Sequence, residues 1–407
     1  MPHLSGTALL LASLLIVTSA QSPDPLPRVA PDVVGLSAER LDEATALLRQ
    51  FVDEGKVAGV VAGVARRGQL AYLEAAGVQS LESRAPMTDR SIFRIYSMAK
   101  SVTAVAAMML YDEGRFRLDD PVSKYLPEFA AVRVASEPGA TPRPPSRPVT
   151  VEDLLLHTSG LSHRTSELYR TLEVRARTMT LPHFVENITR APLLEDPGTR
   201  FRYSEGTTVV GRLIEVWSGQ PFEVFLAERV FTPLGMPDTA FWAAGEQRAR
   251  LVQAYAPTDD GGLTPIEIES TPFTERPALI EGAVGLLSTV PDYLRFSQML
   301  LNGGALDGVR LLKAETAARM TANGLSKDVL AARGNGMTGW ALANVNVVLD
   351  ETAPNVGEYS WDGTGGTIFW VDPRREMVTV LMAQIVPSNP DRIRQRFKAL
   401  VDAAVTR

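Results

Sequence analysis

The 407-residue chain contains no cysteine and only four histidines. Without cysteine there is no disulfide, no thiol nucleophile, no cysteine-ligated zinc and no lipid attached through sulfur. The motif H-E-x-x-H is missing, and no compact cluster combines carboxylates with the histidines, which are His3, His157, His163 and His183. G-x-S-x-G is also missing, which argues against a nucleophile on a strand-to-helix elbow. We therefore expect no metal site and no cofactor.

Lysine is scarce as well, and no block of basic residues occurs. The formal net charge is −6, and the lysines are Lys56, Lys100, Lys124, Lys313, Lys327 and Lys398. A nucleic-acid interface needs clustered positive charge, so nucleic acid is not an expected partner. With 45% hydrophobic and 22% charged residues, the composition is that of a globular protein with one large domain or two interleaved ones.

The first twenty residues are typical of an export signal. Residues 8–17 are almost wholly apolar, and Thr18-Ser19-Ala20 offers small residues for cleavage. We expect cleavage after Ala20, a periplasmic or extracellular location, and a proline-rich linker over residues 21–35. Because no lysine or arginine precedes the apolar run, a leader that stays disordered or tethers the protein to a membrane is the alternative.

Strand patterns lie near both ends of the chain, and helix patterns lie between them. Strands are predicted at residues 57–65 and 70–76, which form a hairpin, and at 340–348, 367–371 and 377–383. Helical spacing is present over residues 36–54 and 392–405 and over much of 118–290. We predict an α+β fold with a sheet domain (36–117 and 291–407), an inserted helical domain (118–290) and a ligand site in the cleft between them.

One hydroxyl and one amine stand out within an apolar helical segment. Ser97 and Lys100 are three residues apart, so a helix places them on the same face. A buried ammonium without a partner is costly, which favours a neutral amine that can act as a base beside the serine. The alternative is structural: Ser97 caps the helix and Lys100 lies along apolar surface.

Two later segments carry further candidate groups. Tyr203 follows a Pro-Gly turn and precedes a helix, and a phenol there can relay protons or simply pack. Trp361-Asp362-Gly363-Thr364-Gly365-Gly366 precedes the strand at residues 367–371. Glycines at that position let a ligand approach the backbone, whose N–H groups can stabilise an oxyanion, although a bulge is the simpler explanation.

In this order, Ser97-x-x-Lys100, Tyr203 and Trp361-Asp362-Gly363 resemble the three motifs of the serine β-lactamase and penicillin-binding-protein superfamily. The similarity is greatest to class C β-lactamases and family VIII carboxylesterases. It implies an antiparallel sheet built from both termini, flanked by helices, in the β-lactamase/transpeptidase-like fold. It also implies an acyl-enzyme on Ser97, proton transfer by Lys100 and Tyr203, and an oxyanion hole formed by the backbone N–H groups of Ser97 and Thr364.

The chain departs from the class C pattern at two places. Trp361 stands where those β-lactamases have a lysine that recognises the substrate carboxylate, and Glu205 stands where they have asparagine. Glu205 can pair with Lys100, repel an anionic substrate or point to solvent. Arg202 or Arg276 can replace the missing charge. We place Trp361, Asp362, Gly363 and Glu205 among the substrate-binding residues, and we expect His157 to be structural.

These observations favour a carboxylesterase that acts on a small-molecule ester with a short acyl chain. The alternatives within the same fold are a β-lactamase, a D-amino-acid peptidase, an amide hydrolase and an acyltransferase. A protein that kept the fold for binding alone is a further alternative, against which the intact Ser97, Lys100 and Tyr203 speak.

Overall fold

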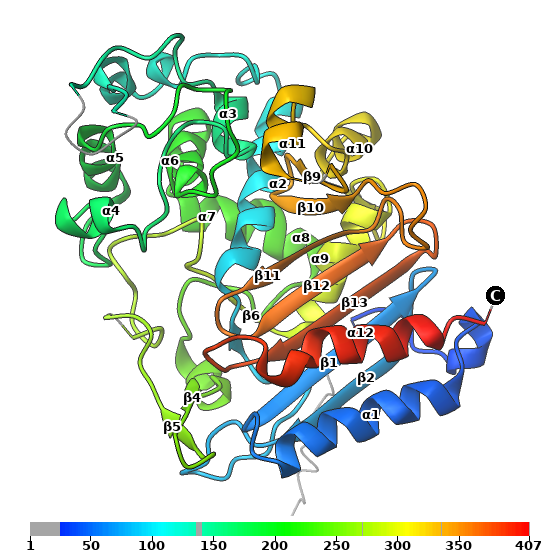
Figure 1. Ribbon diagram of the computed structural model, residues 1–407. Coiled ribbons are helices and arrows are strands. Elements are labelled where there is room, and N and C mark those ends of the chain that lie inside the picture. The colour runs from blue at the N-terminus through cyan, green and yellow to red at the C-terminus, as the bar shows by residue number, and fades with distance from the viewer. Residues whose placement is uncertain (1–24, 136–140, 271, 335, 407) are drawn as a thin grey trace, which may run out of the picture.

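The computed structural model describes residues 25–135, 141–270, 272–334 and 336–406 (Figure 1). The predicted signal peptide and its cleavage site lie outside these residues. In the described ranges, no helix is both long and apolar enough to cross a membrane.

One antiparallel sheet of seven strands organises the described chain, in the order β2-β1-β13-β12-β11-β10-β9. The N-terminal hairpin pairs with the C-terminal strand, with Val60 opposite Ala383, so the two ends of the chain complete one sheet as predicted. The strands are β1 (Gly59–Arg66), β2 (Gln69–Gly77), β9 (Thr338–Ala341), β10 (Val345–Val348), β11 (Tyr359–Gly363), β12 (Thr367–Asp372) and β13 (Met377–Ala383).

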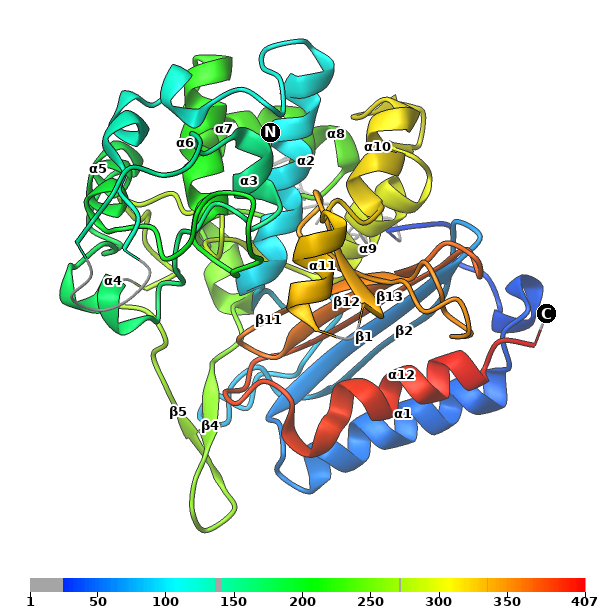
Figure 2. The same cartoon turned by 45° about the horizontal axis from the view of Figure 1, so that its top comes forward.

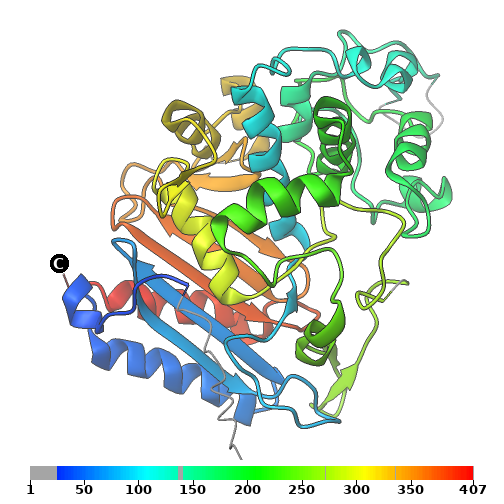
Figure 3. The same cartoon turned by 180° about the vertical axis from the view of Figure 1, so that it is seen from behind.

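Helices cover both faces of this sheet. Helices α1 (Ala38–Asp53) and α12 (Ile393–Ala403) lie side by side on one face (Figure 2). Helix α9 (Val290–Leu301) packs on the other face, against β1 and β13 (Figure 3). Side chains alternate between the faces along each strand. In β12, Ile368 and Trp370 therefore pack toward α1 and α12, whereas Phe369 and Val371 pack toward α9.

Helix α2 (Ala99–Asp112) joins the sheet to the helical region. Its residues from Ala99 to Leu110 are all buried, because a helix that is apolar on every side needs neighbours all round. It packs against α6 (Gly206–Ser218), and one continuous hydrophobic core extends from the helical region through α2 to the sheet. Residues near the start of α2 are therefore held from both sides.

The remaining elements are short and lie mostly around α2 and α6. The helices are α3 (Val151–Leu155), α4 (Glu167–Thr171), α5 (Leu181–Arg190), α7 (Phe222–Leu226), α8 (Thr232–Leu234), α10 (Ala314–Thr321) and α11 (Lys327–Arg333). The short strands are β3 (Phe93–Arg94), β4 (Tyr255–Pro257), β5 (Leu263–Pro265), β6 (Leu287–Ser288), β7 (Ala305–Leu306) and β8 (Val309–Arg310).

The structure differs from the sequence-based expectation in three segments. Residues 340–348 form a hairpin of β9 and β10, with Asn344 at a positive φ of 58° in the turn, instead of one strand. Trp361-Asp362-Gly363, expected only as the segment before the strand at residues 367–371, completes strand β11. In the segment expected as a linker, Leu26 and Val34 are buried and Val29 N–H donates to the Leu70 carbonyl, so this part belongs to the folded body.

Candidate active site

Ser97 lies in a single turn of 3₁₀ helix (Tyr96–Met98) that leads directly into α2. The preceding residue, Tyr96, is fully buried at a φ of 44°. Such a conformation costs a bulky residue about 1–3 kcal/mol and persists only where the surroundings enforce it. Here the Tyr96 ring packs against Gly365 and edge-on to Phe273. The turn that presents the serine is therefore fixed by tertiary contacts.

Lys100 lies in the first turn of α2 with none of its surface exposed. Its Nζ donates to Ser97 Oγ at 3.4 Å and to the Ala283 carbonyl at 3.0 Å. No carboxylate lies within 4 Å of this Nζ in the described part of the chain. The hydrogen-bond partners of this buried amine are therefore a hydroxyl and a carbonyl, both neutral.

Tyr203 and Trp361 meet at this point from different parts of the fold. The Lys100 Nζ lies 4.8 Å from the centre of the Tyr203 ring, over its face. The Tyr203 hydroxyl accepts a hydrogen bond from Trp361 Nε1 at 3.1 Å. The structure thus brings Ser97, Lys100, Tyr203 and Trp361 together where the helical region meets strand β11.

The alternation of side chains along β11 separates the predicted substrate-binding residues. Trp361 faces Tyr203, whereas the Asp362 side chain lies on the opposite face of the sheet and pairs with Arg394 of α12. The structure therefore does not bring the Asp362 side chain to the side of the sheet that holds Tyr203. Gly363 ends the strand, and Thr364 is exposed in the following turn.

Glu205 is fully buried at the start of α6, which excludes the solvent-facing alternative. Its Oε2 accepts a hydrogen bond from Thr208 Oγ1 at 3.3 Å, while Oε1 is buried without a partner. No Lys100–Glu205 ion pair forms within 4 Å in the described structure. Repulsion of an anionic substrate remains the prediction for Glu205.

Two histidines of the helical region, His157 and His163, pack against Tyr203. His157 Nδ1 accepts a hydrogen bond from the Ser204 backbone N–H at 3.2 Å, in keeping with a structural role. Complete burial holds the pKa of His157 well below its usual value, and the charge of Lys100 acts in the same direction. The His163 ring stacks on Tyr203 with 5.6 Å between centroids, and burial lowers its pKa too.

The two arginines considered as replacements for the missing positive charge are already paired. Arg202 contacts Glu195, and Arg276 contacts Glu223. Trp340 packs edge-on against Trp361 with 4.6 Å between ring centroids. The wall beside Tyr203 is thus aromatic, with the Arg333 guanidinium 5.6 Å from the centre of the Trp340 ring.

Sequence reasoning missed the groups that come to the site by backbone contact or long-range packing. Lys100 Nζ donates to two oxygens, and the Ala283 carbonyl is nearer to it than the Ser97 hydroxyl. The loop of Ala283 is held by Thr103 Oγ1, which donates to the Gly282 carbonyl at 2.8 Å, and by Arg175, which binds the buried Glu281 through two nitrogens. Burial opposes ionisation of Glu281, but the Arg175 charge keeps its pKa below the usual value. No sequence pattern identifies a main-chain acceptor.

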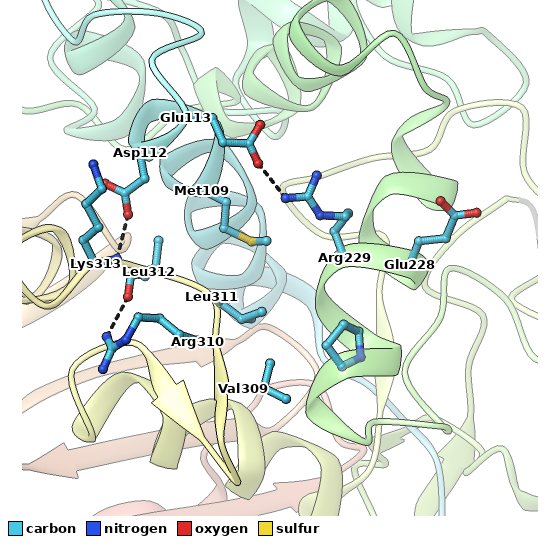
Figure 4. A pocket seen from close by; sticks show the side chains of 11 residues that line it. Met109, Asp112, Glu113, Glu228, Arg229, Val309, Arg310, Leu311, Leu312 and Lys313 are labelled. Atoms are coloured by element: carbon cyan, nitrogen blue, oxygen red, sulfur yellow. Dashed lines mark hydrogen bonds and ion pairs between the residues drawn. The ribbon is translucent and has the colours of Figure 1, made fainter.

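A cavity of about 560 Å³ lies at the opposite end of α2 (Figure 4). Across it, Arg229 pairs with Glu113 at 2.6 Å, and the Lys313 backbone N–H donates to Asp112. At 1.5 Å rise per residue, this end of the helix is about 20 Å from Lys100, so the cavity is separate from the serine. In the described ranges, no group of three or more His, Asp or Glu side chains is placed to hold a metal ion.

The fold and this arrangement define a class of proteins, the serine hydrolases with a β-lactamase/transpeptidase-like fold. A solved structure described as EstCE1, a hydrolase with promiscuous acyltransferase activity, superposes with a TM-score of 0.77 at 25% identity, covering 91% of this chain and 99% of that one.

The sequence comparisons name the family. The β-lactamase family model matches residues 44–404, and the chain belongs to that family. Esterase EstB of Burkholderia gladioli is 30% identical over 368 residues, which cover 84% of this chain and 88% of the relative. Penicillin-binding protein 4 of Amycolatopsis lactamdurans is 33% identical over 319 residues, which cover 77% and 74%.

Proposed function

We propose that this protein is a carboxylesterase that hydrolyses small, uncharged esters with short acyl chains through an acyl-enzyme on Ser97. The observation that carries the proposal is the Lys100 amine, buried without a carboxylate partner in the described structure and 3.4 Å from the serine hydroxyl. An amine in this setting can act as the general base that the serine needs.

In the proposed reaction, Ser97 Oγ attacks the ester carbonyl as its proton passes to Lys100. The backbone N–H groups of Ser97 and Thr364 hold the oxyanion, and the Lys100–Tyr203 pair returns the proton to the departing alcohol. Water then attacks the acyl-enzyme and gives up a proton to the same pair. The pair returns this proton to Ser97 Oγ as the acyl bond breaks, which releases the carboxylic acid and restores the free serine.

The preference for uncharged esters rests on the residues around the serine. Trp361 and Trp340 form an aromatic wall where an anionic substrate would need a cation, and Glu205 is a buried carboxylate nearby. Ser97 itself is only 7% exposed, which favours a small acyl group. The similarity to Esterase EstB supports ester hydrolysis as the reaction.

The test is burst kinetics with p-nitrophenyl acetate and butyrate, compared with hydrolysis of a chromogenic cephalosporin. We expect a burst on the esters and much slower cephalosporin turnover. Ser97→Ala should lower kcat/KM by at least about a thousandfold, because the covalent route is lost. Ser101→Ala removes another buried hydroxyl from α2 and should keep the activity. A phosphonate should label Ser97, and equal activity of wild type and Ser97→Ala would refute the proposal.

Acyl transfer to an alcohol is the second candidate, and it is supported by the printed description of EstCE1. It shares the acyl-enzyme and differs only in the group that attacks it. Hydrolysis in the presence of a primary alcohol separates the two, because transfer yields a new ester at the expense of free acid. We expect acid to be the main product.

A further inference from the structure

Arg394, in the first turn of α12, reaches the end of β11 from the face of the sheet opposite Ser97. Its side chain is buried, with 5% of the residue exposed. Nη1 pairs with Asp362, while Nη2 donates to the Gly363 carbonyl at 3.0 Å and to the Thr367 carbonyl at 3.2 Å. One guanidinium therefore binds both ends of the turn that joins β11 to β12.

The other side of this turn packs directly on the segment that precedes the serine. A Cβ added to Gly363 would lie 2.4 Å from the Ile95 carbonyl oxygen, and one added to Gly365 would lie 2.8 Å from the Tyr96 ring. Thr367 Oγ1 also donates to the Ile95 carbonyl at 3.3 Å. The turn is thus held between Arg394 and the Ile95–Tyr96 backbone.

The peptide group between Gly363 and Thr364 links Arg394 to the proposed oxyanion hole. Its carbonyl accepts from Arg394 Nη2 and from the Gly366 N–H at 3.1 Å, and its N–H is the proposed second donor to the oxyanion. A trans peptide is planar, so its C=O and N–H point in opposite directions. A hydrogen bond that holds the carbonyl toward α12 therefore directs the Thr364 N–H toward the serine side.

Without Arg394, the Gly363 carbonyl would keep only the hydrogen bond from the Gly366 N–H, which comes from within the turn itself. Gly363 has no Cβ and adopts many backbone conformations at low cost. A hydrogen bond from a charged donor is stronger than one between neutral groups, and it also polarises the peptide so that its N–H becomes a better donor.

We infer that Arg394 is a positioning residue for the oxyanion hole: it holds the Gly363–Thr364 peptide so that the Thr364 N–H faces the reacting carbonyl. The inference rests on the proposed function, because it assigns a role within the same acyl-transfer reaction. Arg394 itself does not touch the substrate.

The test is Arg394→Met, assayed with p-nitrophenyl acetate. Loss of a complete oxyanion donor lowers kcat by about 10²–10³-fold, so a donor that is present but no longer held should cost about 10–100-fold. The loss should fall on kcat, with little change in KM, because a ground-state carbonyl gains less from the hole than the oxyanion does.

The inhibition constant of a boronic acid is a measurement that general destabilisation of the fold does not change. The boronic acid forms a tetrahedral adduct on the serine, so its inhibition constant should rise by about the same factor as kcat/KM falls. The matched control is Lys398→Met, one turn further along α12. Lys398 is also a buried cation but contacts Glu358 and Asp402 instead of the turn, and its replacement should leave kcat within about twofold.

Arg394→Lys keeps the charge and serves if Arg394→Met does not fold. A lysine cannot bind three acceptors in the fixed geometry of a guanidinium, so we expect a smaller loss in the same direction. If kcat and the boronic acid constant of the folded Arg394 variants match those of Lys398→Met, the inference is wrong. Inactive wild-type protein, or an active Ser97→Ala variant, would refute the proposed function instead.

Discussion

The two faces of the sheet each hold a buried lysine, and the two lysines have opposite surroundings. On the α12 face, Lys398 is bonded to Glu358 at 2.8 Å and Asp402 at 2.6 Å. On the catalytic face, Lys100 contacts a hydroxyl, a carbonyl and an aromatic ring. A paired buried charge fixes the elements that carry it, whereas Lys100 has only neutral partners, as the proposed base requires.

The same contrast extends to neighbouring side chains of β11. Asp362 is paired with Arg394 on the α12 face, and the adjacent Trp361 lies among aromatic rings on the catalytic face. We interpret the charged face as the support that positions the turn, and the aromatic face as the surface that meets substrate.

Exchanging each lysine for methionine tests this comparison with the largest expected effects. Lys100→Met should lower kcat/KM by about 10²–10⁴-fold, the usual contribution of a positioned base. Its free energy of unfolding should stay the same or rise, since a buried amine with two neutral hydrogen-bond partners is replaced by an apolar side chain. Lys398→Met should keep activity but lose about 3–5 kcal/mol of stability, because Glu358 would stay buried without its cation, bonded only to Asn355. Ester kinetics measure the activity of each variant, and urea unfolding measures its stability. Loss of activity in Lys398→Met and loss of stability in Lys100→Met would contradict the comparison.

The second test of the comparison between the two faces places a positive charge on the aromatic face. Trp361→Lys should raise the kcat/KM ratio for a carboxylate-bearing ester over a neutral ester by about tenfold, since it supplies a cation near the substrate. Trp361→Phe, which keeps a ring but loses the N–H bonded to Tyr203, is the control and should leave that ratio unchanged. An unchanged ratio in Trp361→Lys would mean that position 361 does not meet the charged end of the substrate.

The smallest expected effect concerns the pH dependence of stability. His157 is buried and uncharged, so its folded-state pKa lies below that of the unfolded chain. The unfolded state binds more protons below pH 6.5, and stability should therefore fall with falling pH by up to about 1.4 kcal/mol per pH unit. His157→Asn, a residue that tolerates the positive φ of 56° at this position, should reduce that slope. Thermal unfolding between pH 7 and 5 measures it, and parallel curves would exclude His157 as the source.

Local patterns were enough to predict much of the fold. The hairpin of β1 and β2 forms as predicted, and so do the strands predicted at residues 367–371 and 377–383. These features depend on spacing and turn chemistry within a few residues, which a single sequence contains.

The errors occurred where distant contacts decide the structure. A short segment such as residues 359–363 is a strand only because β10 and β12 lie on either side of it. Burial of Glu205 likewise depends on the elements packed around α6. Neither can be derived from the composition of the segment itself.

The sequence by itself determined that Ser97 and Lys100 share one helical turn, and that an amine would be buried in an apolar segment, because both follow from residue spacing and type. Only the tertiary structure decided which neighbours that amine has, which face of the sheet Asp362 occupies, and that Arg394 binds the turn beside the serine. These depend on strand pairing and on contacts between residues far apart in the chain, where the free energy of packing outweighs local preference.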